Sequence, residues 1–230
     1  MRYGLYGKLP AKRDFIAEGL PPGFLALWEP WIAGGIAASR IELGAQWQPI
    51  YLGAPIWRFW IGPKHLGRTV AGVFMPSVDG IGRYFPLTAV AWMESDETAA
   101  ETIVSPEEDP DGAWYLAAED LLLSALGDDR VYDELLRDLG ELPPPRLAAR
   151  PQLPQGAALG ADGQLAMCGT DASTASVFEG LRTARTAADY AGGIFWWTIG
   201  GGDVPAIVAA GPRMPDPHRF SSFLTGRFQA

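Results

Sequence analysis

The sequence contains no asparagine, one cysteine and two histidines. Without asparagine there is no N-glycosylation acceptor, and turns must depend on Gly, Pro and Asp. The single Cys168 cannot close an intramolecular disulfide, and it is expected to be a small buried apolar residue. His65 and His218 do not stand in a ligand spacing with Cys168, so no metal site is expected.

Long hydrophobic runs are also missing. No apolar stretch reaches the ~18 residues that a membrane-spanning helix requires. The opening segment MRYGLY lacks the apolar region of a secretory signal peptide. Together with the single cysteine, these absences favour a cytoplasmic protein that does not insert into a membrane.

Motifs of catalysis are not found. Ser77, Asp79 and a distant histidine could form a nucleophilic set, but no Gly-x-Ser-x-Gly motif surrounds Ser77. The glycine-rich segments at 80–82 and 200–202 fit neither the P-loop nor the dinucleotide-binding fingerprint, and turns explain them better. The sequence therefore predicts a protein that is not an enzyme and that has no cofactor.

The net charge of -9 is distributed unevenly along the chain. Residues 94–145 hold sixteen acidic residues against two Arg, whereas residues 1–93 hold nine basic residues against five acidic ones. An acidic protein repels nucleic acid and anionic lipid, so neither is expected as a partner. The acidic segment is interpreted as solvated helical surface; the alternative is a docking face for a basic partner.

What the chain does have is enough apolar material for a substantial core, with 230 residues, 48% of them hydrophobic, and nine Trp. Hydrophobic periodicity predicts strands at 2–6, 56–61, 69–75, 84–93, 164–168, 194–199 and 205–210. It predicts helices from residue 24 to Gly44, from a cap at Asp111 to residue 126, and at 131–139, 175–188 and about 220–224.

This order of elements predicts an α/β fold with helices packed on a mixed, partly antiparallel central sheet. The Pro-rich segment at about 142–154 is the one serious candidate for a domain boundary. It is interpreted as an internal crossover, because the chain after it is too poor in core residues to fold alone. Residues 1–230 are therefore expected to form a single domain.

Two loops beside predicted strands concentrate polar and charged side chains. Their candidate binding residues are Lys8, Pro10, Lys12 and Asp14 in residues 7–15, and Ser77, Asp79 and Arg83 in residues 76–83. In a structural interpretation, Ser77 and Asp79 bond to backbone N–H groups and Arg83 pairs with Asp79 or Asp14. In a functional one, the loops bind a partner, because binding residues concentrate on loops carried by a rigid sheet.

Longer motifs at these positions resemble the TagF family associated with bacterial type VI secretion. They are GKLP with DF in residues 7–15, PIWRF at 55–59, and GVFMPSVD with GRYFPL in residues 72–87. The resemblance is dense over residues 1–93 and weaker at FWWT in 195–198 and at 220–226. Arg13 stands where we expect Gly, and Gly80 stands where we expect Arg.

The resemblance implies a three-layer α/β/α fold and a post-translational role, in the cytoplasm, in holding type VI secretion assembly in check. The implied partner is a forkhead-associated scaffold protein linked to a threonine-phosphorylation pathway. The family has no established catalytic residues. The family motif also adds Trp57 and Arg58 to the candidate residues that bind the partner or organise the loops.

Two other functions remain open at this point. Lys8, Lys12 and Arg83 could serve a sensor that responds to phosphate or nucleotide, because they place positive charge on loops of an acidic protein. The chain could also be a structural accessory subunit of the secretion apparatus.

Overall fold

The computed structural model describes residues 1–12, 14–94, 100–127, 130–160, 164–168 and 174–228. Its strands are β1 (Arg2–Gly7), β2 (Ile16–Glu18), β3 (Trp57–Ile61), β4 (Val70–Met75), β5 (Leu87–Trp92), β6 (Glu101–Ile103), β7 (Leu147–Ala149), β8 (Ala157–Leu159), β9 (Leu165–Met167), β10 (Ile194–Thr198) and β11 (Ile207–Gly211). Its helices are α1 (Phe24–Leu43), α2 (Trp47–Leu52), α3 (Pro63–Leu66), α4 (Ala113–Ser124), α5 (Tyr132–Gly140), α6 (Thr174–Gly192) and α7 (Phe220–Thr225), with 3-10 turns η1 (Gly44–Gln46) and η2 (Pro217–Arg219). Each expected strand and helix is present to within a few residues.

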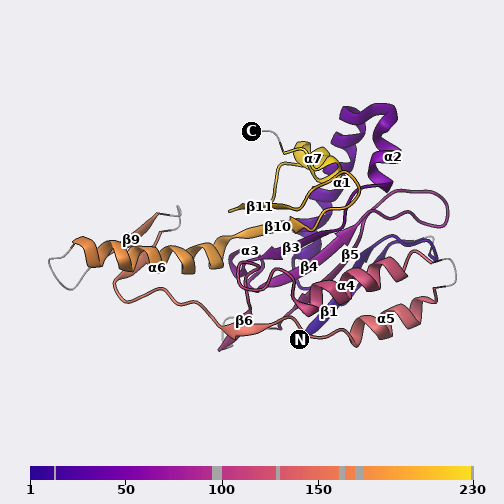
Figure 1. The fold of residues 1–230 in the computed structure, drawn as a ribbon. Helices are drawn as coiled ribbons and strands as arrows, with labels where there is room; N and C mark the ends of the chain where they lie inside the picture. The colour runs from indigo at the N-terminus through magenta and orange to yellow at the C-terminus, as the bar shows by residue number, and fades with distance from the viewer. Residues whose placement is uncertain (13, 95–99, 128–129, 161–163, 169–173, 229–230) are drawn as a thin grey trace.

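A seven-stranded sheet forms the centre of the molecule, in the order β11-β10-β3-β4-β5-β1-β2 (Figure 1). All six of its strand pairs are antiparallel, so the expectation of a mixed sheet was too broad. The physical reason is that short connections reverse the chain between β3, β4 and β5. The sheet takes strands from both sides of the Pro-rich segment, since β10 pairs with β3.

Alternation along β3 divides the core between the two faces of the sheet. Trp57 and Phe59 point to the face that α1 and α7 cover, and Trp60 points to the other face. On the first face the ring centroids of Trp28 and Phe59 lie 4.3 Å apart, and both side chains are fully buried. Burying such aromatic side chains is what fixes α1 on the sheet.

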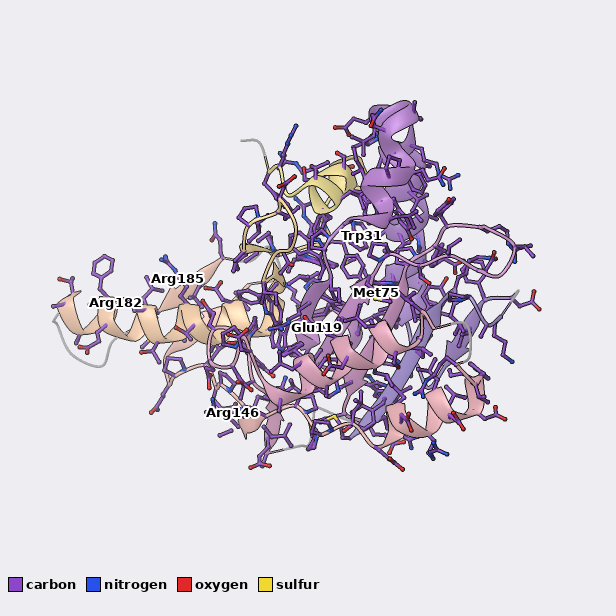
Figure 2. All side chains as sticks on the ribbon, turned by 45° about the vertical axis from the view of Figure 1, so that its right-hand side comes forward. Trp31, Met75, Glu119, Arg146, Arg182 and Arg185 are labelled. Carbon is purple, nitrogen blue, oxygen red and sulfur yellow. The ribbon has the colours of Figure 1, made fainter. Side chains whose placement is uncertain are left out.

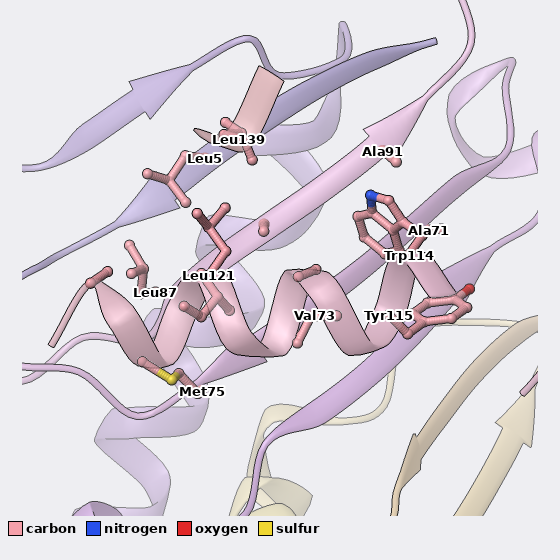
Figure 3. Close-up of a cluster of buried hydrophobic side chains, with 14 of the residues drawn as sticks. Leu5, Ala71, Val73, Met75, Leu87, Ala91, Trp114, Tyr115, Leu121 and Leu139 are labelled. Carbon is pink, nitrogen blue, oxygen red and sulfur yellow. The ribbon is translucent and has the colours of Figure 1, made fainter. Parts of the chain in front are cut away.

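Helices α4 and α5 cover the second face. Figure 3 shows Trp114 and Leu121 of α4 directed toward Ala71 and Val73 of the sheet. Leu139 of α5 joins the same cluster. Helices on both faces of one sheet make three layers, which confirms the α/β/α architecture that the family resemblance implied.

Helix α6 extends away from the sheet (Figure 1), and the β8–β9 hairpin packs along it. Arg182 and Arg185 lie along this projecting helix and are exposed (Figure 2). The C-terminal end of α6 is anchored, because Tyr190 is buried and its hydroxyl lies 3.0 Å from that of Thr69.

The expectations for Cys168 and Asp111 were wrong in detail. Cys168 is exposed instead of buried, because it follows β9 in the small hairpin that lies outside both core clusters. Asp111 does not cap α4: the N-cap position is Gly112 and no side chain bonds there. Asp111 instead accepts a hydrogen bond from Arg58 Nη1 at 2.8 Å.

The close contact between β3 and β4 requires a glycine at position 72. A Cβ atom added at Gly72 would lie 1.9 Å from Cζ of Phe59, which stands opposite it in the neighbouring strand. We therefore expect Gly72→Ala to lower the free energy of unfolding by about 1–3 kcal/mol through overpacking. Urea denaturation at constant m-value measures this change.

The matched control is Gly140→Ala, because Gly140 ends α5 and nothing lies within 4 Å of its added Cβ. This variant is expected to change the free energy of unfolding by at most about 1 kcal/mol. Equal destabilisation by the two substitutions would contradict the steric explanation.

Candidate functional site

The two candidate loops lie at the same end of the sheet. Strands β1 and β4 both pair antiparallel with β5, which stands between them, so they run in the same direction. The loops that follow them therefore leave the sheet at the same end. The backbone N–H of Gly80 donates to the carbonyl oxygen of Lys12 at 3.4 Å. The structure thus brings residues 7–12 and 76–83 together.

A buried ion pair joins the loops. Lys8 Nζ lies 2.6 Å from Asp79 Oδ2, and each residue is only 3% exposed. The Lys8 ammonium also lies 4.5 Å from the centroid of the Phe15 ring. A charge removed from water needs such partners, so each loop fixes the position of the other.

Asp79 also organises its own loop. Its Oδ1 atom accepts hydrogen bonds from the backbone N–H groups of Ile81 at 3.1 Å and Arg83 at 2.9 Å. Its Oδ2 atom accepts a bond from Arg83 Nε at 2.6 Å. These contacts confirm the structural interpretation for Asp79 and for its pairing with Arg83.

The electrostatic consequence is a carboxylate held in its charged form. Burial alone would raise the pKa of Asp79. The hydrogen bonds from Lys8, Arg83 and the Ile81 backbone outweigh burial, and the pKa lies well below the usual 3.8.

Ser77 does not close the loop through its hydroxyl, as the structural interpretation expected. Its side chain is buried, and its Oγ has no hydrogen-bond partner among the residues that the structure describes. Its carbonyl oxygen instead accepts a hydrogen bond from the hydroxyl of Tyr51 at 3.1 Å. Ser77 therefore shapes the loop through its backbone.

Gly80 explains one departure from the family pattern. A Cβ atom there would lie 2.8 Å from the carbonyl oxygen of Pro10, so a side chain would push the two loops apart. Pro10 itself is partly buried at this contact. The other departure, at position 13, falls outside the described residues.

Above this buried framework the loops present what we call the loop surface, made of Lys12, Asp14, Phe15, Ile81 and Arg83. All five residues are exposed, with Phe15 at 49% and Ile81 at 57%. Lys12 Nζ lies 4.1 Å from the centroid of the Tyr132 ring on α5. The surface therefore mixes both signs of charge with apolar side chains.

Phe15 and Ile81 were not among the sequence candidates, although Phe15 directly follows Asp14 and Ile81 lies between Asp79 and Arg83. The sequence did contain a signal for Ile81, because it is an apolar residue between two glycines in a predicted loop, where exposure is expected. Reasoning from charge alone selected the cations and missed the apolar members.

Trp57 and Arg58 are candidates that the structure places elsewhere. Trp57 is buried, and its Nε1 donates to the carbonyl oxygen of Phe223 at 2.8 Å. Arg58 is fully buried on the opposite face, with Nε 2.6 Å from Glu119 Oε1. Figure 2 shows Glu119 on α4, on the other side of the sheet from Trp31 of α1. Both candidates thus belong to the core.

The structure separates the three cations that motivated the phosphate or nucleotide sensor, since Lys12 is exposed and Lys8 is buried. Two of the three cations, Lys8 and Arg83, are paired with Asp79.

Across the described part of the chain no three His, Cys, Asp or Glu side chains gather in a way that could hold a metal ion. No described helix is long and apolar enough to cross a membrane.

Comparison with known proteins identifies similar chains. The family model of the TagF N-terminal domain, described as type VI secretion system-associated, matches residues 4–142. The crystal structure of PA0076 from Pseudomonas aeruginosa PAO1, at 2.05 Å resolution, is similar with a TM-score of 0.76 and 32% sequence identity. That similarity covers 99% of this chain and 96% of that chain. No curated protein matches. The matched residues 4–142 include both loops of the loop surface.

Proposed function

Because the chain belongs to the TagF family of type VI secretion-associated proteins, we propose that it holds type VI secretion in check by binding another protein. The proposed partner is a forkhead-associated scaffold protein of the secretion system, linked to its threonine-phosphorylation pathway. The action is post-translational and takes place in the cytoplasm. It requires binding and no catalysis by this chain.

The observation that carries this proposal is that the loop surface is exposed but rests on a buried framework. The ion pair between Lys8 and Asp79 joins loops from two separate strands, and Asp79 also binds the backbone of its own loop. A loop that is already ordered loses little conformational entropy when it binds. This arrangement supports a role in recognition.

The composition of the loop surface also supports protein binding. Its apolar residues Phe15 and Ile81 are flanked by the charged side chains of Lys12, Asp14 and Arg83. Aromatic residues and arginine are enriched among the residues that dominate binding energy at protein interfaces, and charged groups at the rim set specificity.

We expect Ile81→Lys to weaken binding to the purified forkhead-associated scaffold by about tenfold or more, since it replaces a central apolar contact with a charge. Ile81 is 57% exposed and its side chain supports no core contact cluster, so the thermal unfolding midpoint should stay unchanged. Isothermal titration calorimetry measures the affinity and circular dichroism measures the midpoint.

The matched control is Ile199→Lys. Ile199 is similarly exposed, at 61%, but it follows β10, and β3 separates β10 from β4 and its loop. This variant should bind the scaffold as the parent chain does. Secretion should be derepressed in cells by Ile81→Lys alone, at equal protein abundance. Normal repression and normal affinity in the Ile81 variant would remove the loop surface from the proposal.

A further inference from the structure

Strand β11 forms one edge of the seven-stranded sheet, at the opposite end from β2. It lies beside β10 (Figure 1) and pairs with that strand alone, and no other backbone hydrogen bond to β11 occurs within the described residues. Its sequence, IVAAG, has no charge, proline or bulge to block further pairing, and Val208 is 74% exposed. An unprotected edge of this kind is a template for one more strand.

Hollows flank this edge strand on both faces of the sheet. A cleft of about 670 Å³ touches Ala210 and Gly211 and is lined by Phe195 and residues of α6. A second pocket of about 220 Å³ touches residues 209–211 and is lined by Trp196, with Phe223 and Phe228. Side chains of an added strand would point alternately to the two faces and could enter both hollows.

The second pocket is lined by two arginines without an acidic partner among the described residues. They are Arg213 and Arg219. Trp196 also lines it, is only 2% exposed, and its indole N–H has no acceptor among the described residues. The two arginines therefore give this pocket a positive charge with which an acidic side chain can pair.

We propose that β11 is a docking site for an extended, acidic segment of a partner protein, which adds to the sheet as an eighth strand. The charge of the second pocket selects this occupant, whereas the cleft on the other face has mixed charge, because Glu107 and Asp189 line it as well as Lys64 and His65. Residues 205–228 contain three Arg and one Asp, in a chain whose net charge is -9. The positive charge of Arg213 and Arg219 favours an acidic strand over a second copy of this edge, which carries the same two arginines. An acidic strand instead meets Arg213 and Arg219 on one face.

This site lies apart from the loop surface, and it goes beyond the proposed function. The loop surface follows β1 and β4, whereas β11 is separated from β4 by β10 and β3. The two surfaces can therefore be tested independently, with Ile81→Lys as the control that leaves β11 intact.

The probe is a synthetic peptide of about six residues, the usual length of a strand, in which Glu alternates with Val. Because side chains of a strand alternate between the two faces of the sheet, one of the two registers places every Glu on the face of Arg213 and Arg219. Two further peptides serve as controls: one carries Lys in place of Glu, and one has its alternate amides N-methylated so that it cannot form a ladder. Binding to the full chain is measured by fluorescence anisotropy, and amide protection by hydrogen exchange.

We expect the acidic peptide to bind and to protect β11 amides without protecting those of β2. The Lys peptide and the N-methylated peptide should each bind at least about tenfold more weakly, and so should the acidic peptide to the double variant Arg213→Ala and Arg219→Ala. No binding at millimolar peptide, or equal binding of the N-methylated peptide, would overturn the proposal. So would a concentration-dependent dimer that Val208→Lys abolishes, because the occupant would then be a second copy.

Discussion

Replacing Arg58 with methionine is expected to lower the free energy of unfolding by about 3–5 kcal/mol, the range for breaking a buried ion pair from one side. The Arg58 side chain is fully buried, while that of its partner Glu119 is 12% exposed. Burial would lower the pKa of the guanidinium, but hydrogen bonds with Glu119 and Asp111 outweigh it and raise the pKa. Methionine fills similar volume, so the loss comes from the Glu119 carboxylate left without its partner and from a carbonyl oxygen that loses one of its two donors.

The carbonyl oxygen concerned is that of Pro110, which accepts from Arg58 Nη1 at 2.9 Å and from Trp197 Nε1 at 2.9 Å. Arg58 therefore links β3 both to α4 and to the segment that leads into α4. The substitution should loosen this helix from the sheet, and hydrogen exchange should show faster exchange of α4 amides than of α1 amides.

Two comparisons separate the ion pair from general packing. Asp111→Asn should change the free energy of unfolding by less than about 1 kcal/mol, because the Asp111 side chain is 72% exposed and its pair is screened by water. The double variant Arg58→Met with Glu119→Leu should regain much of the loss, since apolar side chains often replace a buried ion pair without penalty. If the double variant is as unstable as the single one, the buried carboxylate is not the cause.

Periodicity predicted the elements of this fold but not every role of the residues within them. Alternation along residues 56–61 was enough to predict a strand, and the spacing of Trp28 and Trp31 was enough to predict α1. Neither pattern could show that Arg58 is buried, because its partner Glu119 lies 61 positions away in the chain. Asp111 was expected to cap a helix because the sequence shows only its local neighbours. Its actual partner, Arg58, lies on a strand 53 positions away.

The candidate site shows the same division. The residue types in the two loops indicated a contact between Asp79 and Arg83, which are separated by only four positions in the sequence. The Lys8–Asp79 pair spans 71 positions, and only the pairing of β1 and β4 with β5 brings the two residues together. Exposure was equally hidden from the sequence, which is why Lys8 was grouped with Lys12 although one is buried and the other is not.

Substituting Asp79 with asparagine is expected to lower the free energy of unfolding by about 3–5 kcal/mol at neutral pH. Asparagine keeps the shape but removes the negative charge that Lys8, at 3% exposure, requires beside it. The matched control is Lys12→Met, which removes an exposed cation from the loop that carries Lys8 and should cost no more than about 0.5 kcal/mol. Urea denaturation of both variants and the parent chain measures the difference.

The pH dependence of this loss gives an independent check on its cause. The pKa of Asp79 is lowered in the folded state, so its contribution to stability is complete above the unfolded value of about 3.8 and is lost as pH falls further. The gap in stability between the parent chain and Asp79→Asn should therefore be constant from neutral pH to about pH 5 and shrink below about pH 4. A gap that stays constant into strong acid would mean that packing, and not the carboxylate charge, accounts for the loss. The Asp79→Asn variant also tests the proposed function. If the Asp79 carboxylate holds the loop surface in place, this variant should lose scaffold binding at neutral pH under conditions in which the sheet stays folded.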